Sequence, residues 1–100
     1  MAWVVKFRDE SLERLERSTQ YDGGYSPGIC RVFRRRMQFI RAATDERDFY
    51  ALKSLHFEKL KGKRSHQHSM KLNEKWRLII EISTEGKEKI LVVCGIEDYH

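Results

Sequence analysis

The hydrophobic pattern of this chain changes its period near Gln67, and that change constrains the fold more than any other feature. Before this point apolar residues recur every three or four positions, which indicates helices. After it they take every second position, which indicates strands. The helical set is Ile29, Val32, Phe33, Met37 and Ile40, and the strand set is Met70, Leu72, Trp76, Leu78, Ile80 and Ile82. The order of the two patterns predicts an α+β domain in which helices come first and hairpins follow.

The first twenty residues predict a strand and then a capped helix. Residues 2–7 alternate between apolar and mixed positions, which fits an opening strand. Asp9 can cap the helix that follows, because an aspartate oxygen accepts a hydrogen bond from a backbone amide of the first turn. We expect this helix over residues 10–20, with Leu12 and Leu15 buried.

Ser26 and Pro27 mark the start of a second helix that should run to about residue 43. A serine hydroxyl caps the first turn, and the missing N–H of proline costs nothing there. The polar side of this helix is rich in arginine, with Arg31, Arg34, Arg35, Gln38 and Arg41. Such a face either stays in water or receives an acidic partner segment, and helical periodicity does not distinguish the two.

The second half predicts a sheet that the helices cover on one face. A short helical turn near 46–52 leads into a polar loop over 55–64 with two or three apolar anchors. Turns at 73–74 and 84–87 then separate strands. The run 90–96 is apolar and rich in β-branched residues, as expected of a central strand covered on both faces. We therefore expect an N-terminal strand and two helices packed on one face of a mainly antiparallel sheet, with the other face partly open.

The length of 100 residues predicts a single domain over residues 1–100. No apolar run approaches the roughly 18 residues of a membrane span, so we expect no membrane contact and a cytoplasmic protein. Cys30 and Cys94 both lie in apolar surroundings, where a free thiol behaves as a small hydrophobic group. Reduced thiols are the expectation, and a disulfide is the alternative.

The charge is positive and unevenly distributed. Twenty Lys and Arg face fifteen Asp and Glu, which gives a net charge of +5. Residues 29–43 hold five arginines and no acid, and residues 53–77 hold eight basic residues against two acids. A small protein polarised in this way favours a polyanion such as RNA, or an acidic protein segment. A solvated basic face is the alternative interpretation.

The sequence closes on Asp98, Tyr99 and His100, three proton-exchanging or hydrogen-bonding side chains directly after the most apolar strand. His56 lies in the polar loop over 55–64, which is called the basic loop below because it holds three lysines and one arginine. Strand alternation directs Arg77 to the face opposite its neighbour Trp76. Together these groups contain what RNA cleavage requires. A base deprotonates the ribose 2′-hydroxyl, cations stabilise the charged phosphorane, and an acid protonates the leaving oxygen.

Three segments of the second half form a distinctive combination of motifs: Leu-His-Phe-Glu-Lys-Leu-Lys-Gly at 55–62, Ser-Met-Lys-Leu-Asn-Glu-Lys-Trp-Arg-Leu at 69–78, and Glu-Asp-Tyr-His at 97–100. In this order and spacing they resemble the HigB toxins of the RelE superfamily, the plasmid maintenance system killer proteins of bacterial type II toxin–antitoxin pairs. The resemblance is dense from about residue 52 onward. It implies a RelE-like fold and a ribosome-dependent mRNA endonuclease, neutralised by a HigA-like antitoxin with a helix-turn-helix domain.

The resemblance also implies the functional residues. Its histidine falls on His56, its basic residues on Lys61 and Arg77, and its terminal acid, phenol and imidazole on the last three positions. We expect the two histidines to act as base and acid in either order, because their ordinary pKa lies near neutrality. The expected catalytic set is His56, Arg77, Asp98, Tyr99 and His100.

The remaining basic residues of the loop region are expected to hold RNA phosphates without reading sequence. This RNA-binding set is Lys61, Lys63, Arg64 and Lys71. His66 and His68 with His56 could suggest a metal site, but no Asp, Glu or Cys completes the set at a recognised spacing. We therefore expect neither a metal nor another cofactor.

Two other functions remain open. One is a catalytically weak relative that binds RNA, the ribosome or the antitoxin without cleaving, because residues 57–59 lengthen the link between His56 and the Leu-Lys-Gly element. The other is a ParE-like gyrase poison on the same scaffold. That function would leave the combination of His56 with the terminal trio unexplained. Trp76 is expected to be a core residue rather than a platform on which a base stacks.

Overall fold

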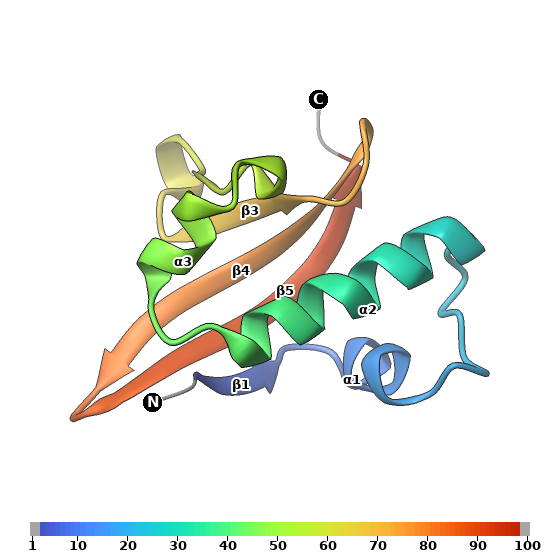
Figure 1. Ribbon diagram of the computed structural model, residues 1–100, viewed down its shortest axis with the longest axis horizontal. Helices are drawn as coiled ribbons and strands as arrows, with labels where there is room; N and C mark the ends of the chain where they lie inside the picture. The colour runs from blue at the N-terminus through green and yellow to red at the C-terminus, as the bar shows by residue number, and fades with distance from the viewer. Residues whose placement is uncertain (1–2, 99–100) are drawn as a thin grey trace.

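The computed structural model describes residues 3–98. Helices come first and hairpins follow, as the change of period predicts (Figure 1). The strands are β1 (Val4–Phe7), β2 (Glu58–Lys59), β3 (Gln67–Lys71), β4 (Trp76–Glu85) and β5 (Glu88–Asp98). The helices are α1 (Glu10–Arg17), α2 (Pro27–Ala42) and α3 (Glu46–Ala51), with short 3-10 turns η1 (Lys53–Leu55) and η2 (Gly62–Arg64).

Both predicted helix starts are confirmed by their caps. The Asp9 carboxylate accepts from the backbone N–H of Ser11 at 2.8 Å, and the Ser26 hydroxyl accepts from that of Ile29 at 3.3 Å. These side chains satisfy backbone donors that the first helical turn leaves without a partner. The predicted end of α1 at residue 20 is wrong, because Ser18 already has an extended backbone and α1 ends at Arg17.

The sheet has the strand order β1-β5-β4-β3-β2. The pairs β2–β3, β3–β4 and β4–β5 are antiparallel, whereas β1 lies parallel to β5. The mainly antiparallel sheet is therefore confirmed. The predicted turn at 84–87 is shorter in the structure, because Glu85 already pairs with Glu88 and leaves Gly86 and Lys87 as the connection. Gly86 has a positive φ of 61°, which glycine adopts without steric cost.

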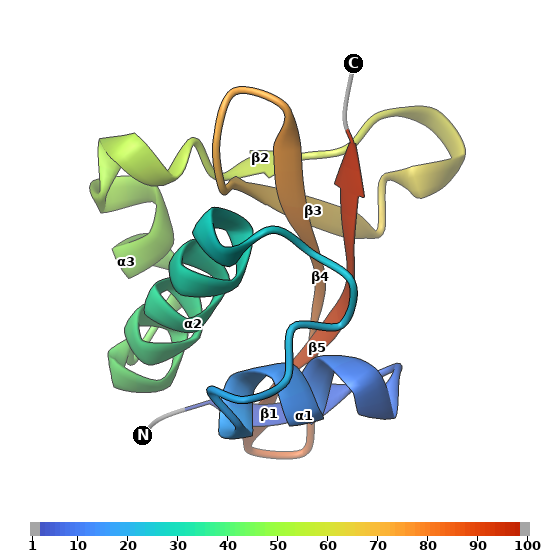
Figure 2. The same cartoon turned by 90° about the vertical axis from the view of Figure 1, so that its right-hand side faces the viewer.

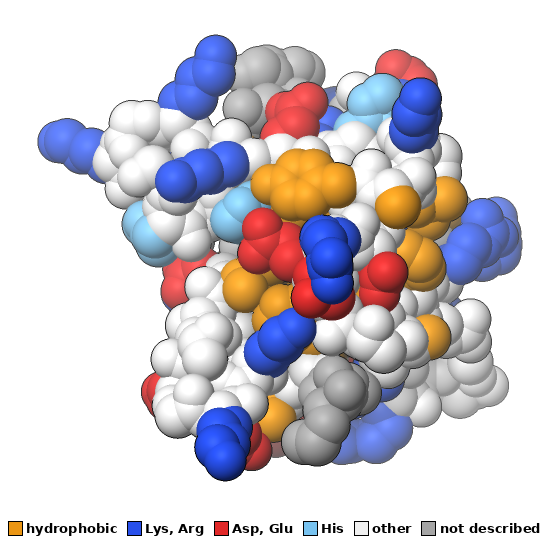
Figure 3. All heavy atoms as spheres, turned by 60° about the vertical axis from the view of Figure 1, so that its left-hand side comes forward, with side chains coloured by type: hydrophobic (Ala, Val, Ile, Leu, Met, Phe, Trp, Pro, Cys, Tyr) orange, Lys and Arg blue, Asp and Glu red, His pale blue; other side chains and the backbone are white. Residues whose placement is uncertain are grey.

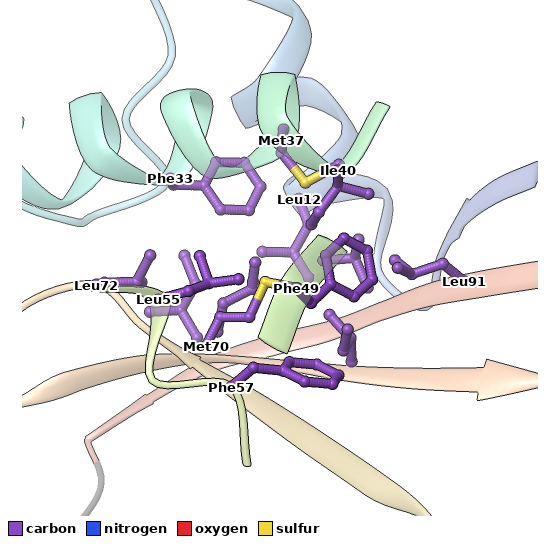
Figure 4. Packing of buried hydrophobic residues seen from close by; sticks show 14 of the residues in the cluster. Leu12, Phe33, Met37, Ile40, Phe49, Leu55, Phe57, Met70, Leu72 and Leu91 are labelled. Atoms are coloured by element: carbon purple, nitrogen blue, oxygen red, sulfur yellow. The ribbon is translucent and has the colours of Figure 1, made fainter. Parts of the chain in front are cut away.

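The three helices cover one face of the sheet and form the core there. Figure 4 shows the apolar side of α2 facing side chains from α3, the loop after it and the sheet. The fully buried residues include Phe33, Met37 and Ile40 of α2, Phe49 of α3, and Met70, Leu78 and Leu91 of the sheet. Each such side chain contributes about 1.5–3 kcal/mol relative to an exposed position, so this layer supplies most of the apolar burial.

The opposite face of the sheet is partly covered by the segment 60–66. Figure 2 shows this segment, in yellow, on the other side of β4 and β5 from α2 and α3. Leu60 of the segment and Ile79 of β4 are buried but lie outside the core cluster. The expectation that 90–96 is covered on both faces is only partly correct, since Val92 and Cys94 remain half-buried. The segment covers only part of this face, so part of β5 remains in contact with solvent.

Cys30 is buried and Cys94 is half-buried, and both are free thiols, as expected. Among the residues that the structure describes, none of the helices has the length and apolar character needed to cross a membrane.

Candidate functional site

The predicted site residues gather at the end of the sheet where β3 ends, β4 begins and β5 ends. Across β4, Arg77 pairs with Lys71 of β3 on one side and with Glu97 of β5 on the other. Residues directly opposite one another in neighbouring strands point to the same face. Arg77, Lys71 and Glu97 therefore form a row on the face away from the helices. Trp76 points the other way, is half-buried, packs against the core and meets Tyr25 edge-on, so the expectation of a core residue is only partly correct.

Arg77 is held from two directions. Its Nε donates to the buried Ser69 hydroxyl at 2.8 Å, and a terminal nitrogen donates to the backbone carbonyl of His56. These contacts fix the guanidinium beside the loop that carries His56. His56 itself has a left-handed backbone with a φ of 46°, which is uncommon outside glycine. Non-glycine residues in such conformations persist where the surrounding structure holds them, often at functional sites.

The His56 side chain is exposed and lies near the turn between β3 and β4. In that turn the Lys71 ammonium lies 2.9 Å from the Glu74 carboxylate. This hydrogen bond and the positive charge of Lys71 lower the pKa of Glu74. Lys71 and Arg77 thus place two cations at this end of the sheet, next to the exposed imidazole.

Asp98 is the last residue that the structure describes, and it lies beside the start of β4. It pairs with Trp76, and its carboxylate is 3.5 Å from the Lys75 ammonium. The other two residues of the predicted trio, Tyr99 and His100, lie outside the described residues. The structure therefore brings His56, Arg77 and Asp98 to one end of the sheet.

The basic loop divides into exposed lysines and one engaged arginine. Lys61 and Lys63 are exposed. Arg64 instead donates through both terminal nitrogens to the Glu97 carboxylate at 2.9 and 2.8 Å, and through Nε to Gln67 at 2.8 Å. Glu97 is a residue that sequence reasoning missed. No periodic pattern relates it to Arg64, because the two belong to different elements that only the fold brings together.

The histidines of the rejected metal site have separate environments. His68 stacks on Phe57 with ring centroids 4.7 Å apart, and burial lowers its pKa. The Nε2 of His66 lies 3.6 Å from the Glu81 carboxylate. Within residues 3–98, no group of three or more His, Cys, Asp or Glu side chains is arranged to hold a metal ion.

Several arginines of α2 contact other elements of the same chain, whereas the sequence predicted either a solvated face or a face that binds an acidic partner. Arg34 donates to three backbone carbonyls around the end of α1, at 2.8–2.9 Å. Arg41 forms a two-point ion pair with Glu16 of α1. Arg36 donates to the carbonyl of Lys71 at 3.0 Å and so ties α2 to the site end of β3. Three of these arginines therefore hold the fold together.

The side of the molecule around α3 has a different character. Its surface mixes hydrophobic, acidic and basic side chains (Figure 3). Tyr50 and Leu52 are large apolar residues that remain 53% and 38% exposed there. Leu52 lines a shallow hollow together with residues of α2 and α3, among them Phe39, Ala43, Asp48 and Ala51. This hollow lacks the cationic groups of the sheet end, which remains the better candidate for a polyanion site.

The architecture of the chain is that of the RelE-like fold. A solved structure described as a YoeB/ParE toxin from Agrobacterium tumefaciens superposes with a TM-score of 0.60 over 100% of both chains, at 17% sequence identity. No curated protein matches the chain in sequence. The family model described as "RelE-like toxin of type II toxin-antitoxin system HigB" matches residues 5–100. The chain belongs to this family.

Membership confirms the resemblance read from residues 55–62, 69–78 and 97–100, and the RelE-like fold is confirmed as well. The protein is thus a toxin of a type II toxin–antitoxin system, which implies an antitoxin as its partner.

Proposed function

We propose that this toxin is a ribosome-dependent mRNA endonuclease that stops translation by cutting mRNA in the decoding site. The observation that carries the proposal is the contact between the Arg77 guanidinium and the backbone of His56, at the end of the sheet to which β5 brings Asp98. A fixed cation beside a histidine and the start of the terminal trio supplies the groups that ribose-assisted cleavage uses. The ribosomal substrate locates this activity in the cytoplasm.

In this mechanism the ribose 2′-oxygen loses its proton to one histidine and attacks the adjacent phosphorus. A bond forms between the 2′-oxygen and phosphorus, and the bond to the 5′-oxygen breaks. The second histidine returns a proton to the leaving 5′-oxygen, so the products are a 2′,3′-cyclic phosphate and a 5′-hydroxyl. His56 and His100 are the two proton carriers, because neutral pH lies near the ordinary pKa of histidine.

The other groups have supporting roles. Arg77 and Lys61 stabilise the extra negative charge of the phosphorane. Asp98 orients or stabilises an imidazole, since a carboxylate is a poor base at neutral pH. Tyr99 stacks on a splayed base or donates to the phosphate. Lys63 and Lys71 hold backbone phosphates on either side of the cut without reading sequence.

The partner of the proposed nuclease is a HigA-like antitoxin with a helix-turn-helix domain. An uninhibited endoribonuclease would stop the growth of its own host, so a specific inhibitor must accompany it. The proposal needs no resident metal or cofactor, because the histidines, Arg77 and the lysines supply the proton transfers and charge stabilisation themselves.

The test is primer-extension mapping of mRNA ends in a translating extract, with and without ribosomes. The wild-type chain should generate new ends only when ribosomes are present. His56→Ala with His100→Ala should abolish them, whereas Lys87→Ala, at the exposed turn between β4 and β5, should not. New ends from the double variant would refute the catalytic assignment. Growth arrest without new ends would favour a catalytically weak binding protein, and induction of DNA damage would favour a ParE-like gyrase poison.

A further inference from the structure

A continuous polar network crosses the face of the sheet opposite the helices. It begins at Arg8, just after β1, which donates to Glu81 of β4 at 2.6 Å. Glu81 also accepts from the side-chain amide of Gln67 at 2.9 Å. The amide oxygen of Gln67 then accepts from Arg64, and Arg64 binds Glu97 through two hydrogen bonds. The network thus connects β4, β3, the segment 60–66 and the end of β5.

Gln67 fixes the direction of this network. The residue is only 6% exposed, and buried polar side chains require hydrogen-bond partners. A glutamine amide has one accepting and one donating end. In Gln67 the accepting oxygen meets the Arg64 guanidinium and the donating nitrogen meets the Glu81 carboxylate, so both ends are matched. Because the Nε of Arg64 is held by Gln67, the two terminal nitrogens of the guanidinium face Glu97.

The pair of Arg64 and Glu97 joins the loop that carries the exposed lysines to the end of the strand that carries Asp98. Arg64 closes η2, in the same loop as the exposed Lys61 and Lys63. Glu97 is paired with Arg77 across the sheet and immediately precedes Asp98. Two parallel N–H···O bonds between an arginine and a carboxylate fix the relative orientation as well as the distance of the two groups.

We propose that Arg64 and Glu97 are positioning residues, which lock the basic loop to the end of β5 and so fix the place of its lysines relative to Asp98. This inference deepens the proposed nuclease function and rests on it. It replaces the expectation that Arg64 contacts an RNA phosphate directly. Three of the five N–H donors of Arg64 are committed to Gln67 and Glu97 in the structure.

The variants Arg64→Gln and Glu97→Gln distinguish a positioning role of Arg64 from direct contact with an RNA phosphate. Both side chains of the pair are 42% exposed, so loss of the ion pair costs little overall stability and the variants should fold. A double variant that exchanges the partners, Arg64→Glu with Glu97→Arg, tests whether the contact itself matters. The matched control is Glu16→Gln, which breaks another two-point pair with an arginine, between α1 and α2.

Single-turnover cleavage on programmed ribosomes, measured against toxin concentration and salt, gives a maximal rate and a half-saturating concentration. Each single Gln variant should lower the maximal rate about tenfold or more, because small misplacements of catalytic groups are costly. The half-saturating concentration and its salt dependence should stay unchanged. The double Gln variant should be no slower than either single variant, since both remove the same contact. The exchanged pair should recover part of the rate, and Glu16→Gln should match the wild type.

The opposite pattern would overturn the inference. If Arg64→Gln weakens ribosome binding and reduces the salt dependence by about one phosphate contact, while Glu97→Gln leaves the rate unchanged, then Arg64 binds RNA directly. Hydrogen exchange of the backbone over 60–66 provides a readout without ribosomes. Exchange should accelerate in both single Gln variants and not in Glu16→Gln. Unchanged exchange in the Gln variants would refute the lock. If the wild-type chain cleaves nothing but exchange is still faster in the Gln variants, only the nuclease function is refuted.

Discussion

Replacement of Arg34 by methionine should destabilise the protein more than any other substitution of an arginine in α2. Methionine keeps most of the aliphatic length and removes the guanidinium. In the wild-type chain that guanidinium donates to the carbonyls of Leu15, Ser18 and Tyr21 at 2.9, 2.9 and 2.8 Å. The last carbonyls of an α-helix have no partner within the helix, so Arg34 acts as a cap for α1 supplied by its neighbour α2.

The magnitude follows from these three contacts. A hydrogen bond to a charged group contributes about 1.5–3 kcal/mol. Arg34 is half-buried, and the carbonyls regain water when the guanidinium is removed, so the full value is not lost at each contact. We expect the free energy of unfolding to fall by about 2–4 kcal/mol. That loss is a large fraction of the ~5–15 kcal/mol that stabilises a typical domain.

Urea unfolding followed by the fluorescence of Trp3 and Trp76 measures this change, because both tryptophans pack in or against the core. With an m-value of about 1.5 kcal/mol/M, the midpoint should fall by roughly 2 M. The control is Arg35→Met on the same helix, where the side chain is exposed and the change should stay within about 0.5 kcal/mol. Equal, small effects of the two substitutions would refute the capping role of Arg34.

Three further predictions concern packing, acid stability and thiol chemistry. Phe33→Ala should cost about 3–5 kcal/mol in urea unfolding, because it leaves a cavity at a fully buried position, and a loss below about 1 kcal/mol would contradict the packing. The backbone N–H of Arg47 and then the Lys89 ammonium lower the pKa of Asp45 to about 2. The ionised form therefore stabilises the fold above pH 3.8, and this stabilisation is lost as the pH falls toward 2. Asp45→Asn should remove that part of the pH dependence, so parallel acid titrations of both chains would be inconsistent with it. Burial raises the pKa of Cys94 to about 11, so iodoacetamide at pH 8 should alkylate it more than about tenfold slower than glutathione; alkylation at the glutathione rate would show that the thiol is not protected.

The parts of the fold that sequence predicts well are those with local causes. The caps at Asp9 and Ser26 act within three residues, and the alternation along β4 is a property of the strand itself. Alternation also correctly separated Arg77 from Trp76 onto opposite faces. The predicted end of α1 is wrong because Arg34, which is distant in sequence, caps a carbonyl of its last turn.

The candidate site could be predicted in composition but not in geometry. Chemistry and the family resemblance pointed to His56, Arg77 and Asp98, and the fold brings these to one end of the sheet. The left-handed backbone of His56 has no local signal, because such conformations are typical of glycine. The contact of Arg64 with Glu97 arises from the way a loop crosses the sheet, which no period in the sequence encodes.

The parallel pairing of β1 with β5 has a consequence for how the toxin is made. Val4 to Phe7 find their partners in Ile90 to Val93, so an edge of the sheet joins segments from opposite ends of the described chain. During synthesis β1 leaves the ribosome long before β5 exists, and contacts between distant segments form slowly. The nascent chain therefore cannot complete its sheet until β5 has emerged. Translation of β5 therefore sets the earliest time at which a folded toxin can appear.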